Sequence, residues 1–208
     1  MHRSKIELHN VDCLPFMKQC EDKQFDLAIV DPPYGIGYSG RDGQKTIKYD
    51  NKKKWDNETP TQEYFDELFR ISKNQIIWGG NYFTDKLPIS RCWICYDKKQ
   101  PEFNSFGKFE LAWASFDAIP LKFEFYPTHV TQGQRIHPTQ KPIQLYKWLL
   151  DKYAKEGDKI LDTHGGSMSI AIACHDYGFD LDICELDKDY FNQAIDRLNN
   201  HVKQQRLF

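Results

Sequence analysis

The residues best suited to chemistry form the segment Asp31-Pro32-Pro33-Tyr34. The apolar run 25–30 before it predicts a buried strand, and a carboxylate after such a strand lies where open α/β sheets bind ligands. The two prolines stiffen the backbone and remove its N–H donors, so their carbonyls remain acceptors. A carboxylate, a rigid carbonyl and an aromatic face suit a flat ligand with an NH2 group, such as a nucleobase. An ordinary strand-ending turn, with Tyr34 packed in the core, is the alternative.

A second candidate site follows the predicted strand 159–161, in a glycine-containing loop that leads to a helix. Glycine lets the backbone approach a ligand, and the N-terminus of the next helix favours a carboxylate. Glu185 follows the predicted strand 181–184, where an acid can accept both hydroxyls of a ribose. Asp12 follows the predicted strand 6–10, although a single acid after a strand is also a common cap or surface group. The loop residues are Asp162, Gly165, Gly166 and Ser167.

The segment 137–142, His-Pro-Thr-Gln-Lys-Pro, places a lysine at the start of a predicted helix. A cation is unfavourable there because the helix dipole is positive at its N-terminus. We therefore expect the Lys141 ammonium to pair with a carboxylate. The alternative is a solvent-exposed lysine.

The elements that must position these residues alternate between strands and helices. Strands are predicted at 6–10, 25–30, 75–78, 92–96, 109–116, 159–161 and 181–184. Helices are predicted at 13–20, 59–72, 141–153, 169–177 and 191–202. In the second of these, Thr59 is predicted to be the cap, Pro60 the first helical residue and Gln62 the residue that closes a capping box. This alternation predicts an α/β fold with a doubly wound sheet.

Two segments, at about 35–58 and 118–135, fit neither period and are predicted as short inserts in a single domain spanning 1–208. The first contains a basic cluster that is suited to DNA phosphates. A solvated loop is the alternative, because Asp42 and Asp50 lie in the same stretch. The cluster consists of Arg41, Lys45, Lys48, Lys52, Lys53 and Lys54.

The composition fits one folded domain. With 208 residues, 40% of them hydrophobic, the chain can fill a core, and its net charge of −2 argues against non-specific coating of nucleic acid. Neither a signal peptide nor an apolar run of about 18 residues is visible, so we expect a cytoplasmic protein. Cys92 and Cys95 lie in a predicted buried strand with no second ligand pair, which favours buried free thiols over a zinc site.

The segment 31–34 resembles the signature [DNS]-P-P-[YFW] of DNA amino-methyltransferases, which act on adenine N6 or cytosine N4. Residues 160–169 are similar to the methionine-binding loop of that family, D-P-F-x-G-S-G-T. Residues 137–142 resemble its H-P-[ST]-x-K-P block. Residues 76–83 resemble the strand and turn of its adenine-modifying members.

The order of these blocks resembles the circularly permuted beta group. That resemblance implies a Rossmann-like S-adenosylmethionine-dependent methyltransferase fold, with helices on both faces of a seven-stranded, mostly parallel sheet and an antiparallel hairpin at one edge. The chain would begin with the third strand of the family, and the first two would come from its C-terminal part. The glycine loop departs from the family, because Thr163, His164 and Met168 replace the usual proline, phenylalanine and second glycine.

The resemblance implies S-adenosylmethionine as cofactor and double-stranded DNA as substrate. Asp12 would contact the cofactor's adenine, Glu185 its ribose and Lys141 its methionine carboxylate. Asn81 and Phe83 would line a base pocket, or serve as a turn asparagine and a core aromatic. The cofactor-binding residues implied are Asp12, Asp31, Lys141, Asp162, Gly165, Gly166, Ser167 and Glu185.

The reaction implied is direct methyl transfer to the N6 of an adenine flipped out of the duplex, in a restriction-modification setting. Asp31 and the Pro32 carbonyl would accept the amine's N–H groups, and Tyr34 would stack on the base. So small an insert suggests a short target site, which a homodimer would extend.

Other functions remain as alternatives. Cytosine N4 methylation, or a catalytically inactive DNA-binding protein, would share the fold. The permuted order and the segment 137–142 speak against an RNA or protein glutamine methyltransferase. An oxidoreductase is disfavoured because no G-x-G-x-x-G follows a predicted strand.

Overall fold

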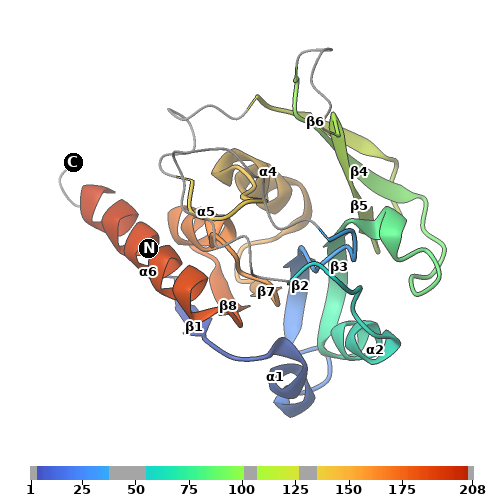
Figure 1. Ribbon diagram of the computed structural model, residues 1–208, viewed down its shortest axis with the longest axis horizontal. Coiled ribbons are helices and arrows are strands. Elements are labelled where there is room, and N and C mark those ends of the chain that lie inside the picture. The colour runs from blue at the N-terminus through green and yellow to red at the C-terminus, as the bar shows by residue number, and fades with distance from the viewer. Residues whose placement is uncertain (1–3, 38–54, 101–106, 127–134, 206–208) are drawn as a thin grey trace.

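The computed structural model describes residues 4–37, 55–100, 107–126 and 135–205, which form a layered α/β fold (Figure 1). The strands are β1 (Ile6–His9), β2 (Phe25–Val30), β3 (Ser72–Trp78), β4 (Cys92–Asp97), β5 (Phe109–Ala114), β6 (Leu121–Glu124), β7 (Lys159–Asp162) and β8 (Asp180–Cys184). The helices are α1 (Cys13–Gln19), α2 (Gln62–Ile71), α4 (Ile143–Tyr153), α5 (Ser169–Tyr177) and α6 (Lys188–Gln205), with a 3-10 turn, η1 (Gly80–Tyr82). None of the helices in these ranges is both long and apolar enough to span a membrane.

The strands form one sheet in the order β1-β8-β7-β2-β3-β5-β4-β6. Neighbours from β1 to β3 are parallel, whereas β5 is antiparallel to both β3 and β4. The C-terminal strands β7 and β8 lie between β1 and β2, which is the permuted arrangement that the motif order predicts. The predicted fold class and the antiparallel hairpin are confirmed.

The predicted number of seven strands is wrong, because the described residues form a sheet of eight. The additional strand, β6, pairs in parallel with β4 at the edge of the sheet. It lies in the segment 118–135, where the sequence predicts an irregular insert. Leu121–Glu124 is only four residues long and alternates between half-buried and exposed side chains. So short an alternation does not stand out in the sequence, and backbone pairing with β4 is what makes it a strand.

Helices cover both faces of the sheet (Figure 1). Each face has its own apolar core. On one face, α4, α5 and α6 contribute Leu149, Ala171 and Leu198 to one cluster. On the other face, α1 and α2 contribute Met17 and Phe65 to a second cluster. The central strands β2, β3 and β7 are therefore enclosed on both sides, which explains their apolar sequences and makes them a rigid support for the residues at their ends.

Helix α2 begins later than the sequence predicts. Thr61, not Thr59, is the N-cap, and its hydroxyl accepts the backbone N–H of Tyr64 at 3.4 Å. Gln62 bonds to Asp66 at 2.9 Å instead of closing a capping box. Thr61 is the better cap because its extended backbone directly precedes the amphipathic turns that face the core.

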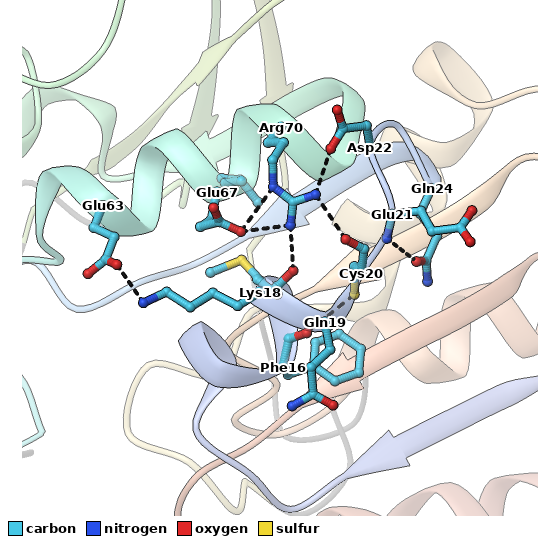
Figure 2. A network of polar contacts seen from close by, with 12 residues as sticks. Phe16, Lys18, Gln19, Cys20, Glu21, Asp22, Gln24, Glu63, Glu67 and Arg70 are labelled. Carbon is cyan, nitrogen blue, oxygen red and sulfur yellow. Dashed lines mark hydrogen bonds and ion pairs between the residues drawn. The ribbon is translucent and has the colours of Figure 1, made fainter.

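The Arg70 guanidinium of α2 ties this helix to α1 (Figure 2). It donates to the backbone oxygens of Met17 and Cys20, both at 2.9 Å, where α1 ends. It also forms ion pairs with Asp22 at 2.7 Å and Glu67 at 2.8 Å. Carbonyls at a helix C-terminus lack intrahelical partners, so this contact satisfies them and fixes how the two helices pack.

Candidate active site

The carboxyl ends of the parallel strands meet at one edge of the sheet. The strand order reverses at the boundary between β7 and β2: the strand that follows β7 in the chain, β8, lies on one side of this boundary, and the strand that follows β2, β3, lies on the other. Such a switch point is where open α/β sheets bind ligands. Asp31 follows β2, Asp162 ends β7 and Glu185 follows β8. Three acids from separate motifs therefore lie at the same edge.

Asp31 and Lys141 form a buried ion pair at this edge. The Lys141 ammonium contacts Asp31 Oδ2 and also lies 3.1 Å from Glu110 Oε2 on β5. The Lys141 side chain is only 3% exposed. Burial alone would lower the pKa of Lys141, but the two carboxylates outweigh it and raise the pKa above its ordinary value. The predicted pairing of Lys141 with a carboxylate is present, and both partners belong to the protein.

Tyr34 positions the same carboxylate from another side. Its hydroxyl donates to Asp31 Oδ1 at 2.6 Å, and its ring stacks on Tyr82 with the centroids 5.0 Å apart. Gly79 has a φ of +70°, and a Cβ there would lie 2.2 Å from Tyr34 Cε1. The glycine after β3 is therefore required both by its left-handed backbone and by the close approach of the Tyr34 ring.

Asp56 is a site residue that the sequence alone did not reveal. Its side chain is buried, and its Oδ1 accepts the backbone N–H groups of Tyr34 at 2.6 Å and Gly35 at 3.0 Å. Its backbone oxygen accepts the N–H of Gly37 at 2.8 Å. One residue thereby fixes the turn after the two prolines. An aspartate within an irregular, charged segment carries no periodic signal that would separate it from a surface acid.

A pocket of about 510 Å³ opens beside Tyr34. Asn81 and Tyr82 of η1 contribute to its lining, as do Phe109 and Leu111 of β5. Tyr82 is 43% exposed and Phe109 is 56% exposed, so their rings are available to a ligand. The volume is within the usual range for small-molecule sites, ~300–1,000 Å³, and a flat aromatic ligand fits such walls.

The glycine loop between β7 and α5 is held against Glu185, a contact that the sequence does not predict. The Glu185 carboxylate accepts the backbone N–H groups of Gly166 at 2.7 Å and Asp187 at 2.8 Å. Gly165 packs so closely on β8 that a Cβ would lie 3.0 Å from Ile183 Cγ1. The loop backbone and the acid therefore form one unit at the ends of β7 and β8.

Met168, which stands where the family has a second glycine, takes the left-handed backbone with a φ of +52°. This conformation costs a non-glycine residue about 1–2 kcal/mol, but the Met168 side chain is fully buried in the core cluster. Arg197 of α6 secures the same loop by donating to the Ser167 carbonyl at 2.7 Å and Ser169 Oγ at 3.0 Å. Burial lowers the pKa of Arg197 to about 10. In the sequence, Arg197 looks like any polar residue of an amphipathic helix.

Thr163 and His164, the other two departures from the family loop, belong to one polar network. The Thr163 hydroxyl lies 2.7 Å from the Tyr64 hydroxyl and 2.9 Å from His164 Nδ1. His164 Nε2 lies 4.0 Å from Cys13 Sγ. Burial lowers the pKa of His164 to about 4, so its ring is neutral at pH 7. The network joins the loop to α1 and α2 through bonds that proline and phenylalanine could not make.

Other candidate residues divide between site and scaffold. The exposed Asp12 caps α1, with its carboxylate accepting a backbone N–H of the first turn at 2.9 Å. Asn81 lines the pocket, whereas Phe83 is a fully buried core aromatic. Cys92 is buried as predicted, but the same prediction is wrong for Cys95, which is half-buried and lines the pocket. The difference arises because side chains alternate across β4.

The basic cluster lies outside the described residues, so its members have no assigned place in the site. These residues are Arg41, Lys45, Lys48, Lys52, Lys53 and Lys54. Within the described ranges, no group of side chains is arranged to hold a metal ion.

Comparison with known proteins places the chain in a family. Residues 48–196 match the model of the N6/N4 methyltransferase family described as DNA methylase. The chain belongs to this family.

The similarity to curated relatives and solved structures covers most of the methylase chain. The chain is 22% identical to the type II methyltransferase M.HpaI of Haemophilus parainfluenzae, over 88% of this chain and 71% of the relative. It is 24% identical to the type II methyltransferase M2.MboI of Moraxella bovis, over 96% and 92%. The M1.HpyAVI–SAM complex has the same fold, with a TM-score of 0.63, 17% identity and coverage of 93% and 99%. The cytosine-N4-specific PvuII DNA methyltransferase matches with a TM-score of 0.64, 9% identity and coverage of 98% and 93%.

Asp162 provides a pH-dependent test of the site's electrostatics. Burial raises the pKa of Asp162 to about 8, and the nearby Asp31 and Glu185 carboxylates act in the same direction. In the unfolded chain its pKa is about 3.9, so the unfolded state binds fewer protons and stability from this group is lost as the pH rises from about 4 to 8. We expect Asp162→Asn to stabilise the methylase, with an advantage in the free energy of unfolding that grows by about 2–4 kcal/mol between pH 5 and pH 8.

Urea unfolding at the two pH values measures this advantage. Asp182 is the matched control, because it is equally buried but paired with Lys159 at 2.5 Å. Although burial alone would raise the pKa of Asp182, the Lys159 ammonium lowers it below its ordinary value. Asp182→Asn should therefore destabilise the protein. A pH-independent effect of Asp162→Asn would contradict a protonated Asp162.

Proposed function

We propose that the chain is an S-adenosylmethionine-dependent DNA methyltransferase that methylates the N6 amino group of adenine. The observation that carries this proposal is the convergence of the Asp31 carboxylate, the pocket beside Tyr34 and the glycine loop on one edge of the sheet. Direct transfer requires the methyl donor and the base to be held next to each other, which sites at one edge of the sheet allow. The DNA methylase family supplies the substrate class, and solved relatives with the same fold include the M1.HpyAVI–SAM complex.

The residues at the ends of β7 and β8 fit the cofactor. Gly165 and Gly166 keep the loop compact between β7 and β8, Glu185 offers acceptor oxygens to a ribose, and Asp162 can bond an amino group. When bound, S-adenosylmethionine supplies an activated methyl group on a positively charged sulfur. Two further cofactor contacts are proposed: Asp12, at the N-terminus of α1, and Ser167, in the glycine loop.

Asp31 prepares the amine that receives the methyl group. An adenine amine is a poor nucleophile because its lone pair is delocalised into the ring. By accepting one N–H at Asp31 and another at the Pro32 carbonyl, the chain draws the nitrogen toward tetrahedral geometry and disperses the positive charge that develops on it. Tyr34 holds Asp31 through its hydroxyl, while Pro33 keeps the turn rigid.

The pocket beside Tyr34 is proposed to receive the flipped base. Extracting a base from the duplex costs a few kcal/mol, and stacking on an aromatic side chain recovers ~1–3 kcal/mol. Tyr34 and Tyr82 are already stacked on each other, and Phe109 lies exposed at the same pocket. An aromatic wall of this kind suits a purine.

Adenine is favoured as the target, with cytosine N4 as the alternative. The tyrosine of the segment 31–34 and the turn 79–83 resemble adenine-modifying members of the family, and the turn places Asn81 and Tyr82 at the pocket. The fold alone does not separate the two targets, because the cytosine-N4-specific PvuII enzyme shares it. The mechanism at Asp31 would be the same for either base.

The chemical roles are tested by Asp31→Ala. We expect the rate of methyl transfer to fall by about 10²–10³-fold or more, because the main acceptor for the amine is gone. Cofactor affinity, measured by calorimetry, should largely persist because the loop and Glu185 are untouched. An equal loss of cofactor binding would contradict the division of roles.

The basic cluster is proposed to hold DNA phosphates, and a second copy of the chain would extend the contact. Replacing Lys52, Lys53 and Lys54 by glutamate should weaken DNA binding and flatten its salt dependence, because fewer counterions are released. Fluorescence anisotropy across a salt series measures both effects. Lys155→Glu is the control, since Lys155 is exposed just before β7, at the opposite end of the strands. Unchanged binding by the triple variant would refute this patch.

A further inference from the structure

Both carboxylate oxygens of Asp31 are engaged in this structure. Tyr34 donates to Oδ1 at 2.6 Å, and the Lys141 ammonium contacts Oδ2. A target amine that bonds to Asp31 must compete with the ammonium for the same acceptor. A cation left close to Asp31 would also oppose the positive charge that develops on the amine nitrogen. The reaction therefore requires Lys141 to have another partner within reach.

Glu110 is that partner. Its Oε2 lies 3.1 Å from Lys141 Nζ. Its Oε1 lies 2.5 Å from Lys98 Nζ, so Glu110 is itself held in place from β4's C-terminal end. The Glu110 side chain is 22% exposed and contributes to the lining of the pocket beside Tyr34. Opposite charges thus alternate from Asp31 through Lys141 and Glu110 to Lys98.

The burial of Lys141 makes the second carboxylate necessary. With 3% of its side chain exposed, the ammonium cannot turn to water when it leaves Asp31, and an unpaired buried charge is strongly unfavourable. Although burial alone would raise the pKa of Glu110, Lys141 and Lys98 lower it to about 2. Glu110 is therefore ionised at any pH at which the methylase works.

We propose that Glu110 is a positioning residue that takes over the Lys141 ammonium when the target amine binds to Asp31. This inference rests on the proposed function, and it adds a residue from the antiparallel hairpin to the machinery at the carboxyl edge. Glu110 acts through Lys141 and does not touch the amine. Its loss leaves Lys141 bound to Asp31, in competition with the substrate.

The test is Glu110→Gln, assayed by single turnover with labelled S-adenosylmethionine and unmethylated DNA. We expect the rate of methyl transfer to fall by about 10–100-fold, which corresponds to about 1.4–2.7 kcal/mol at 1.36 kcal/mol per tenfold change. Cofactor affinity without DNA should change by less than about threefold, because Glu110 is on β5, which β2 and β3 separate from β7 and its glycine loop. Glu110→Asp, which keeps the charge, should regain at least about fivefold of the lost rate.

Asp26→Asn is the matched control. Asp26 lies on β2, is 28% exposed and pairs with Lys73 at 2.6 Å, so its loss removes a paired carboxylate of similar exposure away from the site. The Asp26 variant should keep a rate within about threefold of the wild type. A rate within threefold for Glu110→Gln would overturn the inference. So would a parallel loss of cofactor affinity, or an equal loss of rate in Asp26→Asn, because either result indicates a structural role.

A double variant identifies the residue through which Glu110 acts. With Lys141 replaced by Met there is no ammonium to hold, so adding Glu110→Gln should change the single-turnover rate by less than about threefold. A full additional loss would overturn the proposed route through Lys141. If the wild type itself transfers no methyl group to DNA, the proposed function fails first, and this outcome is distinct from a normal rate in Glu110→Gln.

Discussion

The buried Lys141 ammonium is the contact on which the carboxyl edge depends. It brings together the turn after β2, the segment before α4 and the hairpin strand β5, which are far apart in the chain. A cation removed from water needs anionic partners, and a carboxylate beside it is held in the same way. The ion pair therefore fixes the position of Asp31 and also occupies its Oδ2. In the proposed reaction, the contact between Lys141 and Asp31 must break when the target amine binds.

The rest of the fold keeps this contact rigid. Parallel strands enclosed on both faces end at one edge, and the permuted chain order still brings β7 beside β2. Asp56 fixes the backbone of the turn after β2, Gly79 leaves room for the Tyr34 ring, and Arg197 secures the glycine loop. Each of these residues fixes the conformation of one loop. The loops at this edge can therefore hold their side chains in defined positions.

Much of this arrangement could be predicted from the sequence, because motifs at strand ends converge by topology. The alternation of elements predicts the doubly wound sheet, and the lysine at an unfavourable helix start predicts a carboxylate partner. Neither partner could be identified from the sequence, because Asp31 and Glu110 lie in segments far from Lys141 along the chain. Asp56 and Arg197 bond to backbone atoms, and such contacts leave no pattern in the chain. The strand β6 was missed because four alternating residues gain their structure from pairing with β4.

The most direct measurement is to identify the methylated nucleoside. The purified chain would be incubated with labelled S-adenosylmethionine and unmethylated genomic DNA, and the digested DNA would be examined by mass spectrometry. We expect N6-methyladenine, absent when Asp31 is replaced by alanine. N4-methylcytosine would keep the mechanism and overturn the choice of base, whereas no methylated base despite cofactor binding would contradict DNA methylation by this site.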